Sequence, residues 1–156
     1  MDKLQSTYFF RGFDASESAT LKSLCRIVEA RKGDLILRQG QASDHLYIVR
    51  TGSVKVNVRP GDDDEEAPAG DGPTLIVLGP GECFGEFAFV DRKPSSATVL
   101  ANEDATLYRL YHQDLDDRLL ANPATAAKFY KALLDVMVAR FRNTDIELAV
   151  RKAILG

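Results

Sequence analysis

The chain has 156 residues, which is enough for one well-cored domain and too few for two of ordinary size. Hydrophobic residues make up 45% of the chain and charged residues 28%, the composition of an ordinary soluble globular domain. The net charge of -3 argues against a dedicated nucleic-acid-binding protein, because such proteins usually carry a basic face.

The opening segment carries no sign of secretion or membrane insertion. It has no apolar run long enough for a signal peptide, and no stretch of the chain approaches the roughly 20 apolar residues that span a bilayer. Cys25 and Cys83 are too few for a disulfide scaffold, and neither has neighbours at metal-ligand spacing. We therefore expect a cytoplasmic protein with two reduced, mostly buried thiols.

A helix is predicted near the N-terminus, over about residues 15–28. Asp14 and Glu17 have the spacing of a capping box, in which two side chains satisfy the first free amides of a helix. Apolar residues then recur at helical intervals, at Leu21, Leu24, Cys25 and Val28.

Short strand-like runs separated by glycines follow this helix. The first three are residues 35–37, 46–49 and 54–58. Thr51-Gly52 stands between two alternating runs, so it predicts a tight hairpin.

Residues 60–73 read PGDDDEEAPAGDGP and are acidic, poor in apolar residues and bounded by prolines. This composition predicts an exposed loop between strands. The acidic residues lack the order around a central glycine that an EF-hand requires, so we expect no metal site there.

Strand character resumes over residues 75–78, 96–101 and 105–110. The chain then holds about eight short strands with closely spaced turn signals, which is typical of a sandwich or a roll.

The C-terminal part is predicted to be helical. Asp114 and Asp117 can cap a short helix that carries Leu115, Leu119 and Leu120. Asn122-Pro123 is a strong start signal for a second helix, with Asn as the N-cap and Pro at the first helical position. Neither glycine nor proline interrupts the pattern from there to Leu155, so this helix would be about 50 Å long, more than a small roll covers.

The apolar stripe of the long helix advances in alternating steps of four and three, the pattern of a heptad seam. Its positions are Tyr130, Leu134, Met137, Phe141, Thr144, Leu148, Arg151 and Leu155. Such a seam predicts contact with a partner helix or a second copy of the chain. The alternative is a helix that folds back on its own roll, with the two polar positions exposed.

Residues 78–99 read LGPGECFGEFAFVDRKPSSATV and hold the groups best suited to a ligand. Gly85 lets the backbone come close to a ligand, and Glu86 to Phe89 can form one helical turn whose free amides suit an anion. Glu86 cannot bind a phosphate but can accept hydrogen bonds from ribose hydroxyls. Three hydroxyl side chains follow at the far end of the segment, namely Ser95, Ser96 and Thr98.

This segment resembles the phosphate-binding cassette of cyclic-nucleotide-binding domains. The matching residues are Phe84-Gly85-Glu86-Phe87-Ala88-Phe89, Pro94 and Ala97-Thr98-Val99. The upstream residues Lys32-Gly33-Asp34, Gly40, Ser43-Asp44, Leu46-Tyr47-Ile48-Val49 and Gly52-Ser53-Val54 resemble that family's first strands and turns, and Asn122-Pro123 resembles the start of its last helix.

The resemblance covers nearly the whole chain and implies a mainly β fold with flanking helices. This fold is an eight-stranded antiparallel β-roll (jelly roll) with an N-terminal helix and a long C-terminal helix. We expect one domain over residues 1–156, with an N-terminal helical part over 1–30, the roll over 31–111 and C-terminal helices over 112–156. The residues it implies for ligand binding are Gly85, Glu86, Phe87, Ala88, Ser95, Ser96, Thr98 and Arg140.

One position departs from the family pattern. An arginine that binds the cyclic phosphate follows the cassette proline in the family, whereas this chain has Ser95. Arg92 and Lys93 could replace the missing charge, although solvated turn residues are the simpler interpretation. Arg140 lies where the family's last helix closes over the base, and solvent exposure is again the simpler interpretation.

The sequence thus favours a regulatory module that senses cAMP or cGMP and signals through its C-terminal helices. The alternatives are a degenerate roll that binds no nucleotide and serves as an interaction or dimerisation module, and a pocket for a different anion. We expect no enzyme, since His45 and His112 stand in no catalytic arrangement. We also expect no metal, no cofactor besides the possible ligand, no membrane contact and, because the chain ends at Gly156 without a helix-turn-helix, no DNA contact.

Overall fold

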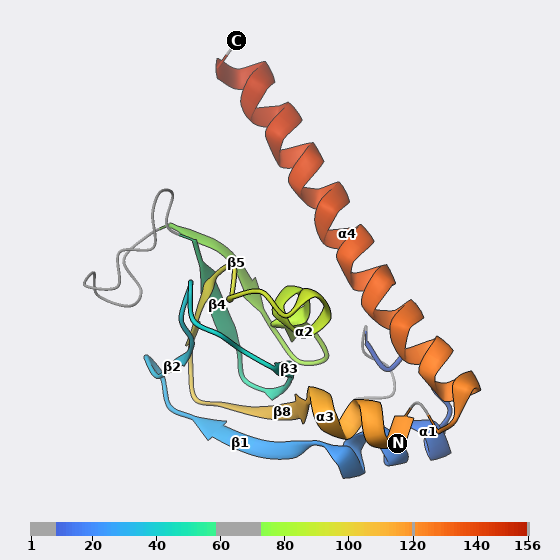
Figure 1. Ribbon diagram of the computed structural model, residues 1–156. Helices are drawn as coiled ribbons and strands as arrows, with labels where there is room; N and C mark the ends of the chain where they lie inside the picture. The colour runs from blue at the N-terminus through green and yellow to red at the C-terminus, as the bar shows by residue number, and fades with distance from the viewer. Residues whose placement is uncertain (1–8, 59–72, 120, 156) are drawn as a thin grey trace.

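The computed structural model of the protein describes residues 9–58, 73–119 and 121–155 (Figure 1). Its elements are α1 (Ala15–Leu24), β1 (Arg26–Ala30), β2 (Leu35–Leu37), β3 (His45–Thr51), β4 (Val54–Asn57), β5 (Thr74–Leu78), β6 (Cys83–Phe84), α2 (Glu86–Asp91), β7 (Thr98–Ala101), β8 (Ala105–Tyr111), α3 (His112–Asp114), the π-helical turn η2 (Leu115–Leu119) and α4 (Pro123–Leu155). The predicted acidic loop over 60–73 lies, apart from Pro73, outside the described residues.

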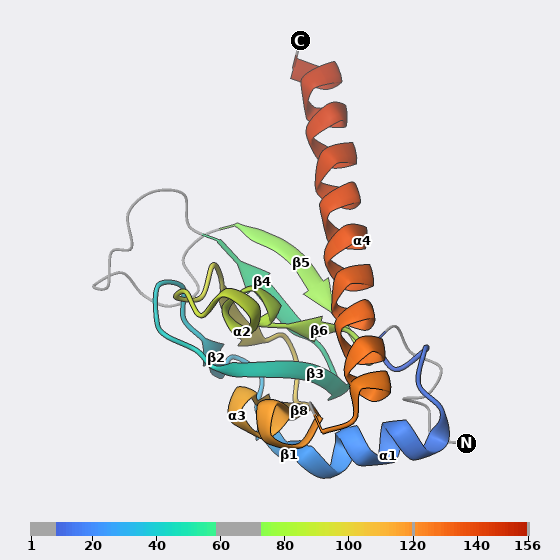
Figure 2. The same cartoon turned by 45° about the vertical axis from the view of Figure 1, so that its right-hand side comes forward.

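The described strands form two antiparallel four-stranded sheets. One sheet has the order β1-β8-β3-β6, and the other has the order β2-β7-β4-β5. Helices α1, α3 and α4 stand at one end of this roll, and α2 lies at its side (Figures 1 and 2). The predicted fold class, a mainly β antiparallel roll with flanking helices, is confirmed.

Strand β3 shows why the first sheet is covered on both faces. Successive side chains of a strand point to opposite faces. Tyr47 and Val49 accordingly belong to a cluster drawn from both sheets, which also holds Leu107, the partner of Val49 on β8. Leu46 and Ile48 belong to a second cluster, which includes residues of α1 and α4. The sheet is therefore packed between the other sheet and the helices.

The first predicted helix ends earlier than expected. The capping box at Asp14 and Glu17 forms, but α1 ends at Leu24 and residues 26–30 form β1. Val28, predicted on the helix, pairs with Leu107 of β8. Because β-branched residues suit a strand and β8 offers a free edge for pairing, the tertiary contact overrides the helical spacing. The strand thus begins inside the predicted helical part over 1–30.

The predicted hairpin at Thr51-Gly52 is wrong, because the strands on its two sides belong to different sheets. Strand β3 pairs with β6 and β8, whereas β4 pairs with β5 and β7. Gly52 has a φ of 78°, and a Cβ there would lie 2.3 Å from the backbone oxygen of Asp104. A glycine is therefore required where the chain crosses from one sheet to the other.

The predicted start of the long helix is confirmed. Asn122 Oδ1 accepts a hydrogen bond from the backbone of Thr125 (3.3 Å), and α4 begins at Pro123. The preceding helical segment begins earlier than Asp114, at His112, without a side-chain cap. The backbone amide of His112 instead donates to the carbonyl of Asp44 (3.0 Å), so contact with the loop before β3 sets the start of this segment.

Helix α4 has two parts with different surroundings. Ala126, Phe129 and Leu133 are buried against the roll. Farther along, the helix rises away from the sheets and ends beyond them (Figures 1 and 2). Across the described ranges, no helix is long and apolar enough to cross a membrane.

Candidate ligand-binding site

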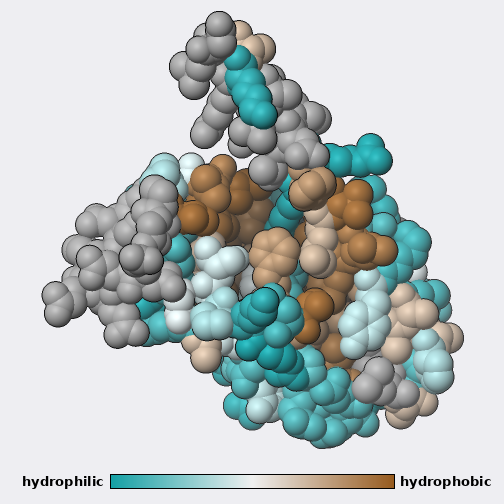
Figure 3. Space-filling model, turned by 45° about the horizontal axis from the view of Figure 1, so that its top comes forward, coloured by the Kyte–Doolittle hydropathy of each residue, from teal (hydrophilic) through white to brown (hydrophobic). Residues whose placement is uncertain are grey.

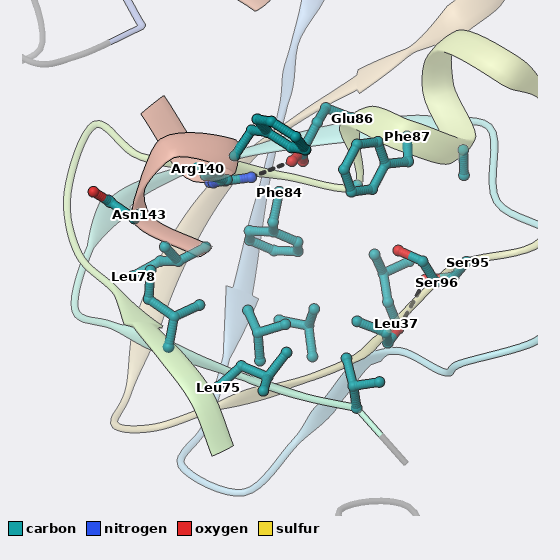
Figure 4. A pocket seen from close by; sticks show the side chains of 18 residues that line it. Leu37, Leu75, Leu78, Phe84, Glu86, Phe87, Ser95, Ser96, Arg140 and Asn143 are labelled. Atoms are coloured by element: carbon teal, nitrogen blue, oxygen red, sulfur yellow. Dashed lines mark hydrogen bonds and ion pairs between the residues drawn. The ribbon is translucent and has the colours of Figure 1, made fainter. Parts of the chain in front are cut away.

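A cavity of about 330 Å³ lies between the second sheet, α2 and α4. This volume is within the range of small-molecule sites, about 300–1,000 Å³. Its walls are mainly apolar, with Leu37, Leu78 and Phe84 among them (Figure 4). Figure 3 shows apolar side chains gathered around the hollow where α4 meets the roll. The cavity can therefore receive a ligand with a large apolar face.

Helix α2 begins at the cavity wall, directly after Gly85. The first helical hydrogen bond is donated by Phe89 to the Gly85 carbonyl (3.1 Å), so the amides of Glu86, Phe87 and Ala88 precede the helical ladder. Gly85 has a φ of 79°, and a Cβ there would lie 3.1 Å from the backbone oxygen of His45. The close approach to β3 requires a glycine here, and Gly85 also lines the cavity, where its predicted approach to a ligand stays a prediction.

Glu86 is the buried carboxylate of the cavity, and its side chain is only 4% exposed. Arg140 of α4 donates a hydrogen bond to Glu86 Oε1 (Figure 4). It donates another to the carbonyl of Cys83. Arg140 is 27% exposed, so its interpretation as a solvent-exposed side chain is wrong. Burial by itself lowers the pKa of Arg140, but the charge of Glu86 raises it above its ordinary value, so the guanidinium stays protonated.

Ser95 is buried at the position of the family's arginine. Its hydroxyl donates to the carbonyl of Ala97 (2.8 Å), and its amide donates to the carbonyl of Gln41 (2.8 Å). Gly40 in turn donates to the Ser95 carbonyl (2.8 Å). Serine therefore ties its turn to the loop after β2, and its hydroxyl proton is already committed.

The structure brings seven of the eight predicted site residues to the cavity. These are Gly85, Glu86, Phe87, Ala88, Ser95, Ser96 and Arg140. Thr98, the first residue of β7, does not line it; its hydroxyl accepts a hydrogen bond from the amide of Gln39 (3.0 Å).

Arg92 and Lys93 lie outside the cavity wall. Lys93 is exposed, as the interpretation of a solvated turn predicts. Arg92 is half-exposed and bonds His112, so it is not merely solvated. Neither residue supplies a cation where Ser95 stands.

Several cavity residues were not predicted as site residues. Val56 and Ile76 come from paired strands, and Phe141 and Asn143 come from α4. The sequence shows the first two only as strand positions and Phe141 as part of the helix seam. Their shared cavity depends on how α4 is placed relative to the second sheet, which no local pattern in the sequence predicts.

Neither cysteine is suited to redox chemistry or metal binding in this structure. Cys83 is buried and Cys25 is half-buried, and neither is in a disulfide. Burial raises the pKa of each thiol to about 12. The described part of the chain holds no cluster of three or more His, Cys, Asp or Glu that could bind a metal.

Comparison with known families matches residues 27–122 to the cyclic nucleotide-binding domain. This range contains β2 to β8, β1 except for its first residue, and the whole segment around α2.

Similar proteins include a CRP-like cAMP-activated global transcriptional regulator of Mycobacterium tuberculosis. It is 32% identical over 142 residues, which are 90% of this chain and 58% of the relative. The crystal structure of the Thermus thermophilus catabolite activator protein has a TM-score of 0.75 and 28% identity, over 94% of this chain and 63% of that one. A cyclic nucleotide-binding domain from Methylobacillus flagellatus has a TM-score of 0.77 and 25% identity, over 89% and 74%. The chain spans less than two thirds of the curated relative's length.

Proposed function

This chain belongs to the cyclic nucleotide-binding domain family, and we propose that it is a regulatory module that binds cAMP or cGMP in the cavity and signals through α4. The observation that carries the proposal is the contact of Arg140 with Glu86, because it joins the ligand site directly to the signalling helix. No catalytic role is part of the proposal. The two unpaired cysteines accord with a cytoplasmic location.

Competition for Glu86 gives a mechanism of signalling. The ribose hydroxyls of a nucleotide need the carboxylate of Glu86 as an acceptor, and Arg140 already occupies one of its oxygens. A ligand that takes this oxygen changes the contact that holds α4 to the site. Ligand binding and helix position are then linked, because the ligand favours one arrangement of α4 over the other.

The phosphate would be held without the family's arginine. A charge-assisted hydrogen bond contributes roughly 1.5–3 kcal/mol, so its loss lowers affinity roughly 10- to 150-fold. The amides at the start of α2 remain as donors, and Arg140 supplies a cation to the described part of the cavity wall. We therefore expect weak but measurable binding.

A second candidate function is an interaction module that binds no nucleotide. It is favoured by the Ser95 hydroxyl, which donates its hydrogen bond to the carbonyl of Ala97 and so stabilises its own turn. The exposed apolar side chains of α4, with Leu134 59% and Phe141 68% exposed, would then be the working surface.

Calorimetric titration with cAMP and with cGMP tests the proposal. We expect heat of binding from at least one nucleotide, and a loss of roughly tenfold in affinity in Glu86→Gln, because the ribose acceptor loses its charge. Glu103→Gln, an exposed carboxylate between β7 and β8, is the matched control and should bind like the wild type. Hydrogen exchange in α4 should change on binding.

Absence of binding by the unaltered protein at millimolar nucleotide would contradict the proposed sensor. It would leave the interaction module as the better account of the structure.

A further inference from the structure

A cluster of charged residues joins the end of α2 to the segment that leads into α4. Arg92, directly after α2, bonds Nδ1 of His112 through its guanidinium. Asp116 of η2 lies close to both, with its Oδ2 3.0 Å from His112 Nδ1 and 3.9 Å from Arg92 Nη2. The three side chains lie outside the cavity wall, so nucleotide binding does not account for them.

The backbone of Arg92 forms the C-cap of α2, where its amide donates to the carbonyl of Ala88 (3.0 Å). Arg92 has a φ of 61° and is the one residue other than glycine with a positive φ in the described ranges. A left-handed conformation costs an L-residue roughly 1–2 kcal/mol, so glycine or asparagine would suit this position better. The bond with His112 gives a physical reason for arginine here.

The cluster is coupled to the core through Phe89. This side chain is 1% exposed, and its ring centroid lies 5.0 Å from that of His112 and 6.0 Å from that of Phe129. Helix α2, the start of α3 and the buried part of α4 therefore meet at one ring. A change in how α2 lies against His112 reaches α4 by direct packing.

The contact depends on the proton of His112. An imidazole nitrogen accepts a hydrogen bond from Arg92 only when it carries no proton. Once protonated, the same nitrogen becomes a donor, is repelled by Arg92 and can bond the nearby carboxylate of Asp116.

The groups around His112 act in opposite directions. Burial and then the charge of Arg92 lower the pKa of His112 below its ordinary value, while Asp116 and Asp44 oppose them. Asp44 faces His112 from the loop before β3, where its carbonyl accepts from the His112 amide (3.0 Å). The neutral form, which bonds Arg92, is thus the resting form at neutral pH.

We propose that Arg92, His112 and Asp116 form a proton-dependent contact between α2 and the segment that precedes α4. Neutral His112 accepts a hydrogen bond from Arg92, whereas protonated His112 releases Arg92 and donates to Asp116, whose Oδ2 already lies 3.0 Å from Nδ1. Acidification then loosens the end of α2 and biases the position of α4. The proposal does not require a nucleotide, so its test is independent of the test for cAMP or cGMP binding.

A pH titration followed by NMR on the full chain tests this contact. The amides of Asp91, Arg92 and Lys93 should shift with the same midpoint as the His112 ring. This titration should disappear in His112→Gln, which keeps an acceptor for Arg92 but cannot take a proton. His45→Gln is the matched control, because it removes the other of the two histidines and should leave the titration unchanged. The proposal would be overturned if these amide shifts had a midpoint different from that of the His112 ring, or if they titrated unchanged in His112→Gln.

Two further variants predict shifts of opposite sign in the His112 midpoint. Arg92→Gly removes the cation and suits the positive φ, so the midpoint should rise by roughly half a pH unit. Asp116→Asn removes the nearby carboxylate, so the midpoint should fall by a similar amount. Shifts of the same sign, or none in either variant, would show that the three side chains do not act on one another.

Discussion

Ser95 and Arg140 together set the charge of the cavity. Ser95 takes the place of the arginine that the family resemblance implies, and its hydroxyl bonds Ala97 within its own turn. Arg140 enters from α4 and neutralises Glu86, the buried carboxylate. Among the described residues of the cavity wall, one cation and one anion are present and are paired with each other, which leaves the amides of α2 to bind an added negative charge.

Replacing Ser95 by arginine tests whether the rest of the phosphate site is intact. If it is, Ser95→Arg restores a charge-assisted contact, and affinity for cAMP or cGMP should rise tenfold or more, from roughly 1.5–3 kcal/mol. Adding Glu86→Ala to this variant should remove much of the gain, since the ribose hydroxyls lose their acceptor. Calorimetry on the three proteins measures both effects. Equal, undetectable binding in all three would mean that the site does not take a cyclic nucleotide.

At the scale of the element, the first turns of α4 are buried and later turns are exposed. Phe129 is fully buried and lies against Phe9 and Phe89, with ring centroids 5.5 Å and 6.0 Å away. Phe141, three turns later, is 68% exposed and lines the mouth of the cavity. The first turns of α4 are therefore part of the core, whereas its later turns are available to a ligand or a second chain.

This division predicts unequal effects of two substitutions by alanine. Phe129→Ala should lower the free energy of unfolding by about 3–5 kcal/mol, because it leaves a cavity among buried rings. Val138→Ala, at an exposed position of α4 outside the predicted seam and the cavity wall, is the control and should change it by less than about 0.5 kcal/mol. Chemical denaturation followed by circular dichroism measures both values. A similar loss in both variants would contradict the assignment of only the first turns to the core.

On the scale of the whole molecule, the roll covers only part of α4. Tyr130, Leu134 and Phe141 of the predicted seam are exposed, and Met137 between them is partly buried. The side chains of the later seam positions, Thr144, Leu148, Arg151 and Leu155, lie outside the described residues. A parallel homodimer through α4 stays a prediction, and it is favoured by the exposed apolar side chains, which a second helix would cover.

Light scattering tests the predicted dimer. The unaltered protein should have the mass of two chains, and Met137→Glu with Phe141→Glu should have the mass of one, because charges at the seam oppose helix pairing. Leu75→Glu, at an exposed position on β5, is a control for added surface charge and should remain dimeric. A monomeric unaltered protein at high concentration would contradict the seam.

The sequence by itself determined the features that depend on neighbours along the chain. The capping box at Asp14, the start of α4 at Asn122-Pro123 and the helical turn after Gly85 are local hydrogen-bond arrangements, and all three form as predicted. The ordered match to a family pattern determined the roll. The cluster of cassette residues at one cavity follows for the same reason, since most of them are consecutive.

Only the tertiary structure decided what depends on distant partners. The pairing of Val28 with β8 ended α1 early, and the crossing at Gly52 sent β4 to the other sheet. Arg140 lies 54 positions from Glu86, and nothing in the helical pattern distinguishes an arginine that bonds a buried carboxylate from one in solvent. Long-range contacts decide whether a side chain is buried. A charged side chain that is buried must be paired, as Arg140 is with Glu86, whereas an exposed one is hydrated by solvent.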